Sequence, residues 1–188
     1  MPAIKKVPRE NIISAAVAII REGGMAALNA RSLSKKLNCS TRPLYLSFAG
    51  MGEIKAAAIE RITEIYQSFL SNEAVSGKYP VYKSFGMGYI KFAMAEKELF
   101  SYMFMRKRAA GAPDDVDIEP VIAAVMRATG LSYEDAKLFH FESWIFVHGL
   151  AAMAASGFAV YDEQTVSMLL TDMFEGLKAR FKQRQTKE

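Results

Sequence analysis

The sequence predicts an all-α protein, and three observations support that fold class. Apolar residues recur at spacings of three and four along the chain, and no segment shows the alternation of a half-buried strand. Glycine, asparagine and proline stand where helices of that spacing should begin or end. With 51% hydrophobic residues among 188, the chain can bury a sizeable core. We expect a small domain over residues 1–50 and a larger helical bundle over residues 51–188.

The first predicted helix begins near Pro8, a residue suited to a first helical position. Apolar residues at helical spacing from Ile12 to Ile20 mark its inward face. Gly23 and Gly24 then end it, because glycine readily adopts the left-handed backbone that closes a helix.

Residues 29–48 predict two short helices separated by a tight break. Leu33 and Leu37 lie four apart and share the inward face of the first. Asn38 interrupts the pattern, since asparagine tolerates a left-handed backbone, and Ser40 suits the N-cap of the next helix. This arrangement is typical of a helix-turn-helix, whose second helix enters the major groove of DNA.

The second helix of the pair, predicted for residues 40–48, has two faces. Leu44 and Phe48 repeat at four and point inward, and Pro43 falls in the first turn, where a proline is tolerated. The outward residues are Thr41, Arg42, Tyr45 and Ser47. These types suit contact with DNA, although an ordinary solvated helix face has the same composition.

Residues 9–55 resemble the DNA-binding domain of the tetracycline-repressor (TetR) family of transcriptional regulators. The family's Thr-hydrophobic-Arg-x-Ile-Ala stands here as Asn-Ala-Arg-Ser-Leu-Ser at residues 29–34. Its Gly-Val-Ser turn stands as Asn-Cys-Ser at residues 38–40, and its Leu-Tyr-x-x-Phe signature as Leu-Tyr-Leu-Ser-Phe at residues 44–48. The resemblance implies a homodimer bound to a roughly palindromic operator in double-stranded DNA.

The residues expected to contact DNA follow from this motif. Arg42 could reach the acceptors of guanine or a phosphate, whereas Thr41 and Tyr45 suit phosphate or sugar. Where the family often has a phosphate-contacting lysine, this chain has Met51, and Lys55 is a candidate to replace that contact. The predicted set is Arg31, Ser40, Thr41, Arg42, Pro43, Tyr45, Ser47 and Lys55.

Charge is distributed unevenly along the chain. Residues 1–61 hold ten Lys and Arg against four Asp and Glu, a net charge of +6, and residues 62–188 hold fourteen against sixteen, a net charge of −2. Such an asymmetry also fits an ordinary solvated surface. Because the basic part contains the helix-turn-helix, it favours contact with phosphates.

Six further helices are predicted, which makes about nine in all. Gly86 and Gly88 lie inside the fifth, where each should cost about 1 kcal/mol relative to alanine, so a close neighbour, kink or cavity is expected to offset them. Gly130 ends the seventh. The predicted ranges are 54–75, 81–93, 99–104, 118–128, and two long helices that begin near residues 133 and 162.

The last two helices suit a dimer interface. The eighth carries Phe141, Trp144, Ile145, His148 and Ala152 on one face, and its later side chains are small. The ninth shows a continuous apolar stripe at helical spacing. The TetR resemblance implies dimerisation through such a pair of helices. The Trp and His-Gly residues at 144 and 148–149 also resemble the Trp-His-Gly element of one group of family C-terminal domains.

Aromatic and methionine residues in the middle of the chain could line a site for an apolar effector, since methionine adapts to irregular spaces. For any one of these residues a place in the core is the simpler interpretation. His148 could equally be a structural histidine at the dimer interface. The TetR resemblance implies a small-molecule effector, and the predicted ligand-binding set is Phe85, Tyr89, Met103, Phe104, Trp144 and His148.

Several classes of protein are disfavoured by the sequence. A single cysteine excludes a disulfide framework, and two histidines without cysteine partners do not make a zinc site. No catalytic grouping, cofactor motif or signal peptide is recognisable, and no apolar stretch reaches the roughly 20 residues of a membrane span. We therefore expect a cytoplasmic protein that is not an enzyme and has no metal or cofactor.

The favoured interpretation is a ligand-responsive transcriptional regulator, a repressor released from its operator by a small apolar effector. The alternative is a DNA-binding regulator without such an effector, acting constitutively or with a protein partner. A helical enzyme that shares the fold is disfavoured, because no catalytic residues are recognisable.

Overall fold

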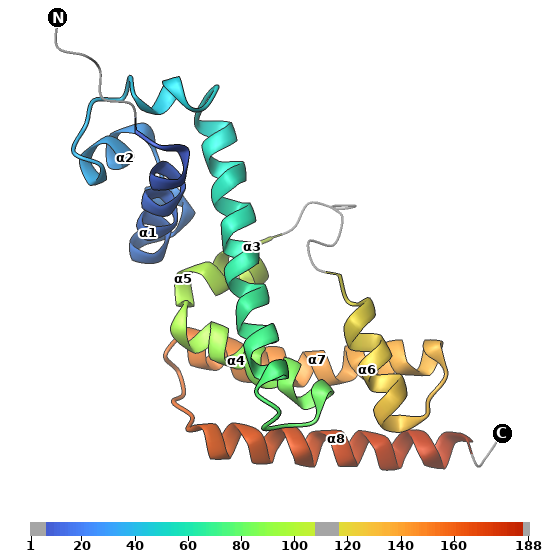
Figure 1. Cartoon of the computed structure of the whole chain (residues 1–188). Coiled ribbons are helices and arrows are strands. Elements are labelled where there is room, and N and C mark those ends of the chain that lie inside the picture. Colours follow the sequence, from blue (N-terminus) through green and yellow to red (C-terminus); the bar gives the residue numbers. More distant parts are fainter. Residues whose placement is uncertain (1–6, 108–116, 186–188) are drawn as a thin grey trace, which may run out of the picture. The chain divides into compact units, whose positions relative to one another are not determined.

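The computed structural model describes residues 7–107 and 117–185, and every regular element within them is helical, which confirms the predicted all-α class. Eight α-helices follow one another within these described residues, with a short 3₁₀ segment (η1) and a π-helical turn (η2) among them (Figure 1). Their bounds are α1 Arg9–Ala27, α2 Ala30–Lys36, η1 Leu44–Leu46, α3 Met51–Val75, α4 Val81–Ala95, α5 Lys97–Phe100, η2 Ser101–Met105, α6 Glu119–Thr129, α7 Tyr133–Ala155 and α8 Glu163–Gln185.

The chain divides into two compact units. The first comprises Met1–Gln67 and Glu96–Arg106, and the second comprises Ser68–Ala95 and Lys107–Glu188. Helix α3 therefore begins in the first unit and ends in the second. The predicted division at residue 50 stays a prediction.

The first unit is built around the buried face of α1, in which Ile12, Ala16 and Ile20 are fully buried. Burying each large apolar side chain contributes about 1.5–3 kcal/mol. At the predicted end of this helix, Gly23 and Gly24 do leave the helical conformation, and the φ of Gly24 is 70°. The glycines thus end the first helical run as predicted, and one more turn follows the kink and continues to Ala27.

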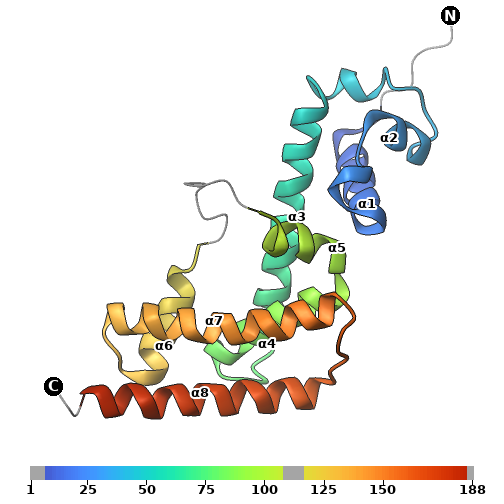
Figure 2. The ribbon, with the colours of Figure 1, turned by 180° about the vertical axis from the view of Figure 1, so that it is seen from behind.

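The core of the second unit centres on Phe139 of α7, which is fully buried. Its ring lies 5.4 Å from that of Phe174 and 5.5 Å from that of Phe181, measured between centroids, and both partners belong to α8. Figure 2 shows α7 and α8 side by side and antiparallel, as a connection of seven residues requires. Val166, Leu170 and Phe181 are buried, so the apolar stripe of α8 serves mainly to hold that helix within its own unit.

Gly88 in α4 is required by the backbone of α3. A Cβ atom at this position would lie 2.7 Å from the carbonyl oxygen of Phe69 and 3.0 Å from the Cα of Leu70. At Gly86 a Cβ would instead meet a methyl group of Leu170 at 3.1 Å. The close neighbour expected from the sequence is therefore found, and only at Gly88 is it a rigid one.

Gly88→Ala is expected to lower the free energy of unfolding by about 1–3 kcal/mol, because forcing extra volume against a backbone costs that much. Gly86→Ala, the matched control, should lie within about 1 kcal/mol of wild type, since the Leu170 side chain can move and alanine favours the helix. Urea denaturation measures both. If Gly88→Ala is as stable as the control, α3 and α4 can move apart enough to admit a Cβ atom without lowering the free energy of unfolding.

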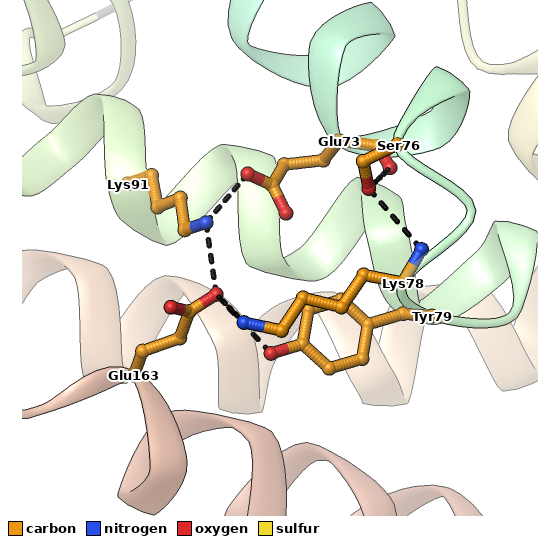
Figure 3. Close-up of polar contacts among 6 residues, drawn as sticks. All are labelled: Glu73, Ser76, Lys78, Tyr79, Lys91 and Glu163. Carbon is orange, nitrogen blue, oxygen red and sulfur yellow. Dashed lines mark hydrogen bonds and ion pairs between the residues drawn. The ribbon is translucent and has the colours of Figure 1, made fainter.

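A network of charges fastens the beginning of α8 within the second unit (Figure 3). Glu163 Oε1 accepts hydrogen bonds from Lys78 Nζ and Lys91 Nζ, both at 3.0 Å, and from Tyr79 Oη at 3.2 Å. Lys91 also pairs with Glu73, near the end of α3. The network thus joins three helices and the connection between two of them.

Glu163→Gln is expected to lower the melting temperature at neutral pH. The bonds from Lys78 and Lys91 hold the pKa of Glu163 at about 2, below its ordinary 4.5. A carboxylate with a depressed pKa stabilises the folded state above its unfolded pKa and loses that effect as pH falls. The difference in melting temperature should therefore shrink between pH 4.5 and about 2.

The control for this variant is Glu175→Gln, the same change on α8 at a residue with no ion pair in the described part of the chain. Equal melting temperatures for the two variants at neutral pH would mean that solvent screening cancels the effect of the network.

Candidate nucleic-acid interface

Helix α2 is defined at both ends by local hydrogen bonds. Asn29 caps its beginning, and the Oδ1 atom accepts from the N–H groups of Arg31 and Ser32, both at 3.0 Å. Asn38 has a φ of 48°, the left-handed conformation that its residue type predicted. The N–H of Asn38 bonds to Lys35 O, and the following N–H bonds to the carbonyl of residue 34, which is the Schellman pattern.

Residues 40–48, which we call the reading segment, are not the α-helix that the sequence predicted. They contain the single 3₁₀ segment η1. The N–H groups of Leu44, Tyr45 and Leu46 each bond to the carbonyl three residues back, at 3.1, 3.2 and 3.4 Å. Ser40 was expected to cap the helix, but η1 begins after Pro43 and no side chain caps it.

Pro43 contributes to this departure, because its ring disfavours the helical conformation in the residue before it. Its φ of −56° and ψ of −30° fit the start of a 3₁₀ turn. The side chain is buried, so the predicted role of Pro43 as an outward DNA-binding residue is not supported by its position.

The remaining outward residues of the reading segment lie on its surface. Leu44 and Phe48 are buried beneath it, as predicted, at 0% and 3% exposure. Ser40, Thr41 and Arg42 are exposed, and Tyr45 is 46% exposed. The two candidates from neighbouring helices, Arg31 and Lys55, are exposed as well. The structure thus brings six of the eight predicted residues to the surface of the first unit.

Ser47 is less exposed than predicted, and its neighbour Leu46 is an exposed apolar residue. Ser47 is half-buried, and its hydroxyl donates to the carbonyl oxygen of Val7 at 3.2 Å, which ties it to the chain before α1. Leu46, which has no role in the predicted set, is 53% exposed beside Tyr45. The sequence already indicated this exposure, because Leu46 does not share the four-residue spacing of the inward residues Leu44 and Phe48.

Three of the predicted effector residues meet in the second unit. Tyr89 Oη and His148 Nδ1 are 2.9 Å apart, and the His148 ring stacks on that of Trp144 with centroids 5.0 Å apart. Tyr89 is buried, whereas Trp144 is 38% exposed and also stacks on Phe141. Burial lowers the pKa of His148, so its ring is neutral at pH 7.

The other predicted effector residues are distributed over both units. Phe85 lies on α4 in the second unit, one turn before Tyr89, and is half-buried. Met103 and Phe104 lie on η2 in the first unit. The Phe104 ring packs edge-on against that of Tyr66 at 5.2 Å, in keeping with a place in the core.

One face of α7 is apolar and uncovered. Leu138, Phe141 and Ile145 are 42%, 56% and 54% exposed, and Trp144 lies among them. We call these four residues the α7 face. Contrary to the expectation that no stretch would reach the length of a membrane span, α7 is long and apolar enough to cross a membrane by length and composition. A single helix of this kind is a weak indication, because core helices pass the same test, and the opposite side of α7 is packed into the unit.

The family model described as "Tetracyclin repressor-like, C-terminal domain" matches residues 82–176. No curated protein matches the sequence significantly. The match runs from α4 into α8 and so includes most of the second unit.

Three solved structures have a similar fold. The multidrug binding protein EbrR, complexed with imidazole, gives a TM-score of 0.59 at 18% identity over 88% of each chain. A member of the TetR family from Streptomyces coelicolor A3 gives 0.56 at 16% identity, over 88% of this chain and 96% of that one. SmeT, the repressor of the Stenotrophomonas maltophilia multidrug efflux pump SmeDEF, gives 0.51 at 17% identity over 89% and 88%.

Proposed function

The chain belongs to the tetracycline-repressor-like family of DNA-binding transcriptional regulators, which are not enzymes, and we propose that it is a homodimeric, cytoplasmic repressor released from its operator by a small apolar molecule. The family model spans half of the 188 residues. The membership gives the general class of function, and the arrangement of residues supports the more specific parts of the proposal.

The reading segment is the observation that carries the proposal. Arg42 and Tyr45 project from a short turn whose other side, Leu44 and Phe48, is buried in the core of the first unit. A cationic and an aromatic hydroxyl side chain held in this way suit contact with bases, phosphates and sugars. Two copies in a dimer would enter successive major grooves of a roughly palindromic site.

The α7 face supports the homodimer. Isolated exposed apolar residues are ordinary, but a continuous apolar stripe along one helix marks a surface that another protein covers. The stripe continues into Gly149 and Ala152, which are small enough to allow a partner helix to approach closely. We therefore infer that two copies of α7 meet, and that α8 contributes less than the sequence suggested because its stripe faces inward.

The effector proposal draws on the cluster of Tyr89, Trp144 and His148, whose rings and polar atoms lie together in the second unit. Among proteins of similar fold, EbrR binds multiple drugs and SmeT represses a multidrug efflux pump. A small apolar molecule that binds one conformation of the dimer more tightly would shift the population towards it. DNA is released if, in that conformation, the distance between the two reading segments no longer matches the spacing of successive major grooves.

Selection from a random-sequence pool of duplex DNA tests the proposal. The wild-type dimer should enrich a roughly palindromic sequence, and its affinity for the selected duplex should fall steeply with salt, as phosphate-dominated binding does. Failure to enrich any sequence at low salt would contradict the proposed function.

The effector is tested separately. A thermal-shift screen with apolar compounds should find one that raises the melting temperature, because a ligand that binds only the folded state stabilises it. The same compound should release the selected duplex. If no compound does both while DNA binding is normal, the alternative regulator without a small-molecule effector is favoured.

A further inference from the structure

Resting on the proposed DNA-binding function, we propose that Arg9 and Glu53 form a clamp that positions the reading segment for contact with DNA. Arg9 is the first residue of α1, and Glu53 lies in the first turn of α3. The two helices flank the reading segment in the chain, and neither residue is among those expected to touch DNA.

Arg9 makes three contacts at the end of the reading segment, two with the segment itself and one with Glu53. Its Nη1 atom donates to the carbonyl oxygen of Ser47 at 3.0 Å and pairs with Glu53 Oε1 at 2.8 Å. The guanidinium carbon lies 3.9 Å from the centroid of the Phe48 ring, a cation–π distance. The guanidinium group is planar and always charged, so its face can stack on the Phe48 ring while the N–H groups along its edge donate hydrogen bonds.

Glu53 completes the clamp from the other side. Its Oε2 atom accepts the N–H of Ala49, the residue that follows the reading segment, at 2.7 Å. This backbone bond, and then the bond from Arg9, lower the pKa of Glu53, so the carboxylate is ionised at neutral pH. One carboxylate therefore fixes both Arg9 and the backbone that leaves the reading segment.

The reading segment needs such support because its own backbone bonds are weak. A 3₁₀ turn has poorer hydrogen-bond geometry than an α-helix, and η1 is only three residues long. Hydrogen bonds from Arg42 or Tyr45 to DNA would weaken steeply with small errors in distance or angle. The buried side chains of Leu44 and Phe48 fix the segment from below, and the clamp fixes its end.

Charge and positioning predict opposite results when the carboxylate is removed. Glu53→Gln removes one negative charge from the basic first unit, which by long-range electrostatics alone should strengthen binding to phosphates. If the carboxylate positions the reading segment, the same change should weaken binding. The direction of the effect therefore separates the two roles.

The chain offers a matched control in Glu10→Gln. Glu10 follows Arg9 in α1, and its carboxylate bonds to Arg61 of α3 at 2.6 and 3.1 Å. Losing it removes the same charge and breaks an arginine pair in the same unit. This pair has no contact with the reading segment, so only the effect on net charge should remain.

The experiment measures the affinity of each variant for the duplex that the wild-type protein selects and for an unrelated duplex. Glu53→Gln should lower affinity for the selected duplex by about tenfold or more, the effect of losing hydrogen bonds to a charged group. Glu10→Gln should leave that affinity equal to wild type or slightly higher. The ratio of selected to unrelated affinity should fall only for Glu53→Gln, which a general loss of charge would not produce.

Arg9→Lys provides the second variant. It keeps the positive charge and the bond between Glu53 and Ala49, but lysine has no planar group to stack on Phe48, so selected affinity should again fall. This variant decides the question if circular dichroism shows that Glu53→Gln is unfolded. Binding by Glu53→Gln and Arg9→Lys equal to that of Glu10→Gln would overturn the clamp, whereas a wild-type protein that selects no duplex would overturn the proposed function itself.

Discussion

Arg42→Ala and Tyr45→Ala are each expected to lower the affinity of the dimer for its selected duplex by about 30-fold or more. A side chain that bonds well to a base or to a charged phosphate contributes about 1–3 kcal/mol, and a dimer loses the contact twice. Both side chains are exposed on the reading segment and leave no cavity when truncated. Gel-shift titrations at fixed salt measure the effect.

The two substitutions should also differ from each other. If Arg42 reads a guanine, Arg42→Ala relaxes the preference at one base pair, whereas loss of a phosphate contact weakens binding to every sequence and reduces the salt slope. Tyr45→Phe separates the hydroxyl from the ring. Arg127→Ala removes the same charge from an exposed site on α6 and should bind as wild type does. Normal binding by Arg42→Ala and Tyr45→Ala would exclude the reading segment as the DNA contact.

Phe141→Asp is expected to convert the dimer to a monomer at micromolar concentration. Phe141 is 56% exposed on the α7 face, where a twofold axis would bury it in both copies. An unpaired charge that becomes buried costs several kcal/mol, so two of them should raise the dissociation constant by about three orders of magnitude or more. Analytical ultracentrifugation measures the dissociation constant, and affinity for the selected duplex should fall with it.

Phe158→Asp is the matched control for this prediction. Phe158 lies between α7 and α8, outside the α7 face, and is 83% exposed, so an aspartate there should remain in water. The control should therefore stay dimeric. A Phe141→Asp protein as dimeric as the control would mean that copies of the chain meet through another surface.

Local signals predicted much of the fold. The left-handed backbone at Asn38 and at Gly130, where φ is 75°, follows from residue type, because few side chains tolerate that conformation. Asn29 replaces the usual threonine of the family and caps α2; this role was not predicted, although both residue types cap helices well. The inward positions of Leu44 and Phe48 follow from spacing alone.

Other features depended on neighbours distant in the sequence. The reading segment was predicted as an α-helix from its apolar spacing, but a 3₁₀ turn places Leu44 and Phe48 in the core as well. The need for Gly88 comes from the backbone of α3 at Phe69. The contact between Arg9 and Glu53 joins residues 44 positions apart, for which no spacing in the sequence gives a signal.

The sequence by itself determined the helical class, the position of the helix-turn-helix and the residue types on its outward side, because these depend on local backbone preferences and on the period of the apolar residues. Only the tertiary structure decided that Pro43 is buried, that Ser47 is held near α1, and that α7 rather than α8 leaves an apolar face uncovered. The physical reason is that an apolar residue at helical spacing shows only that it will be covered. Which element covers it, or whether a second molecule must, depends on how the helices pack.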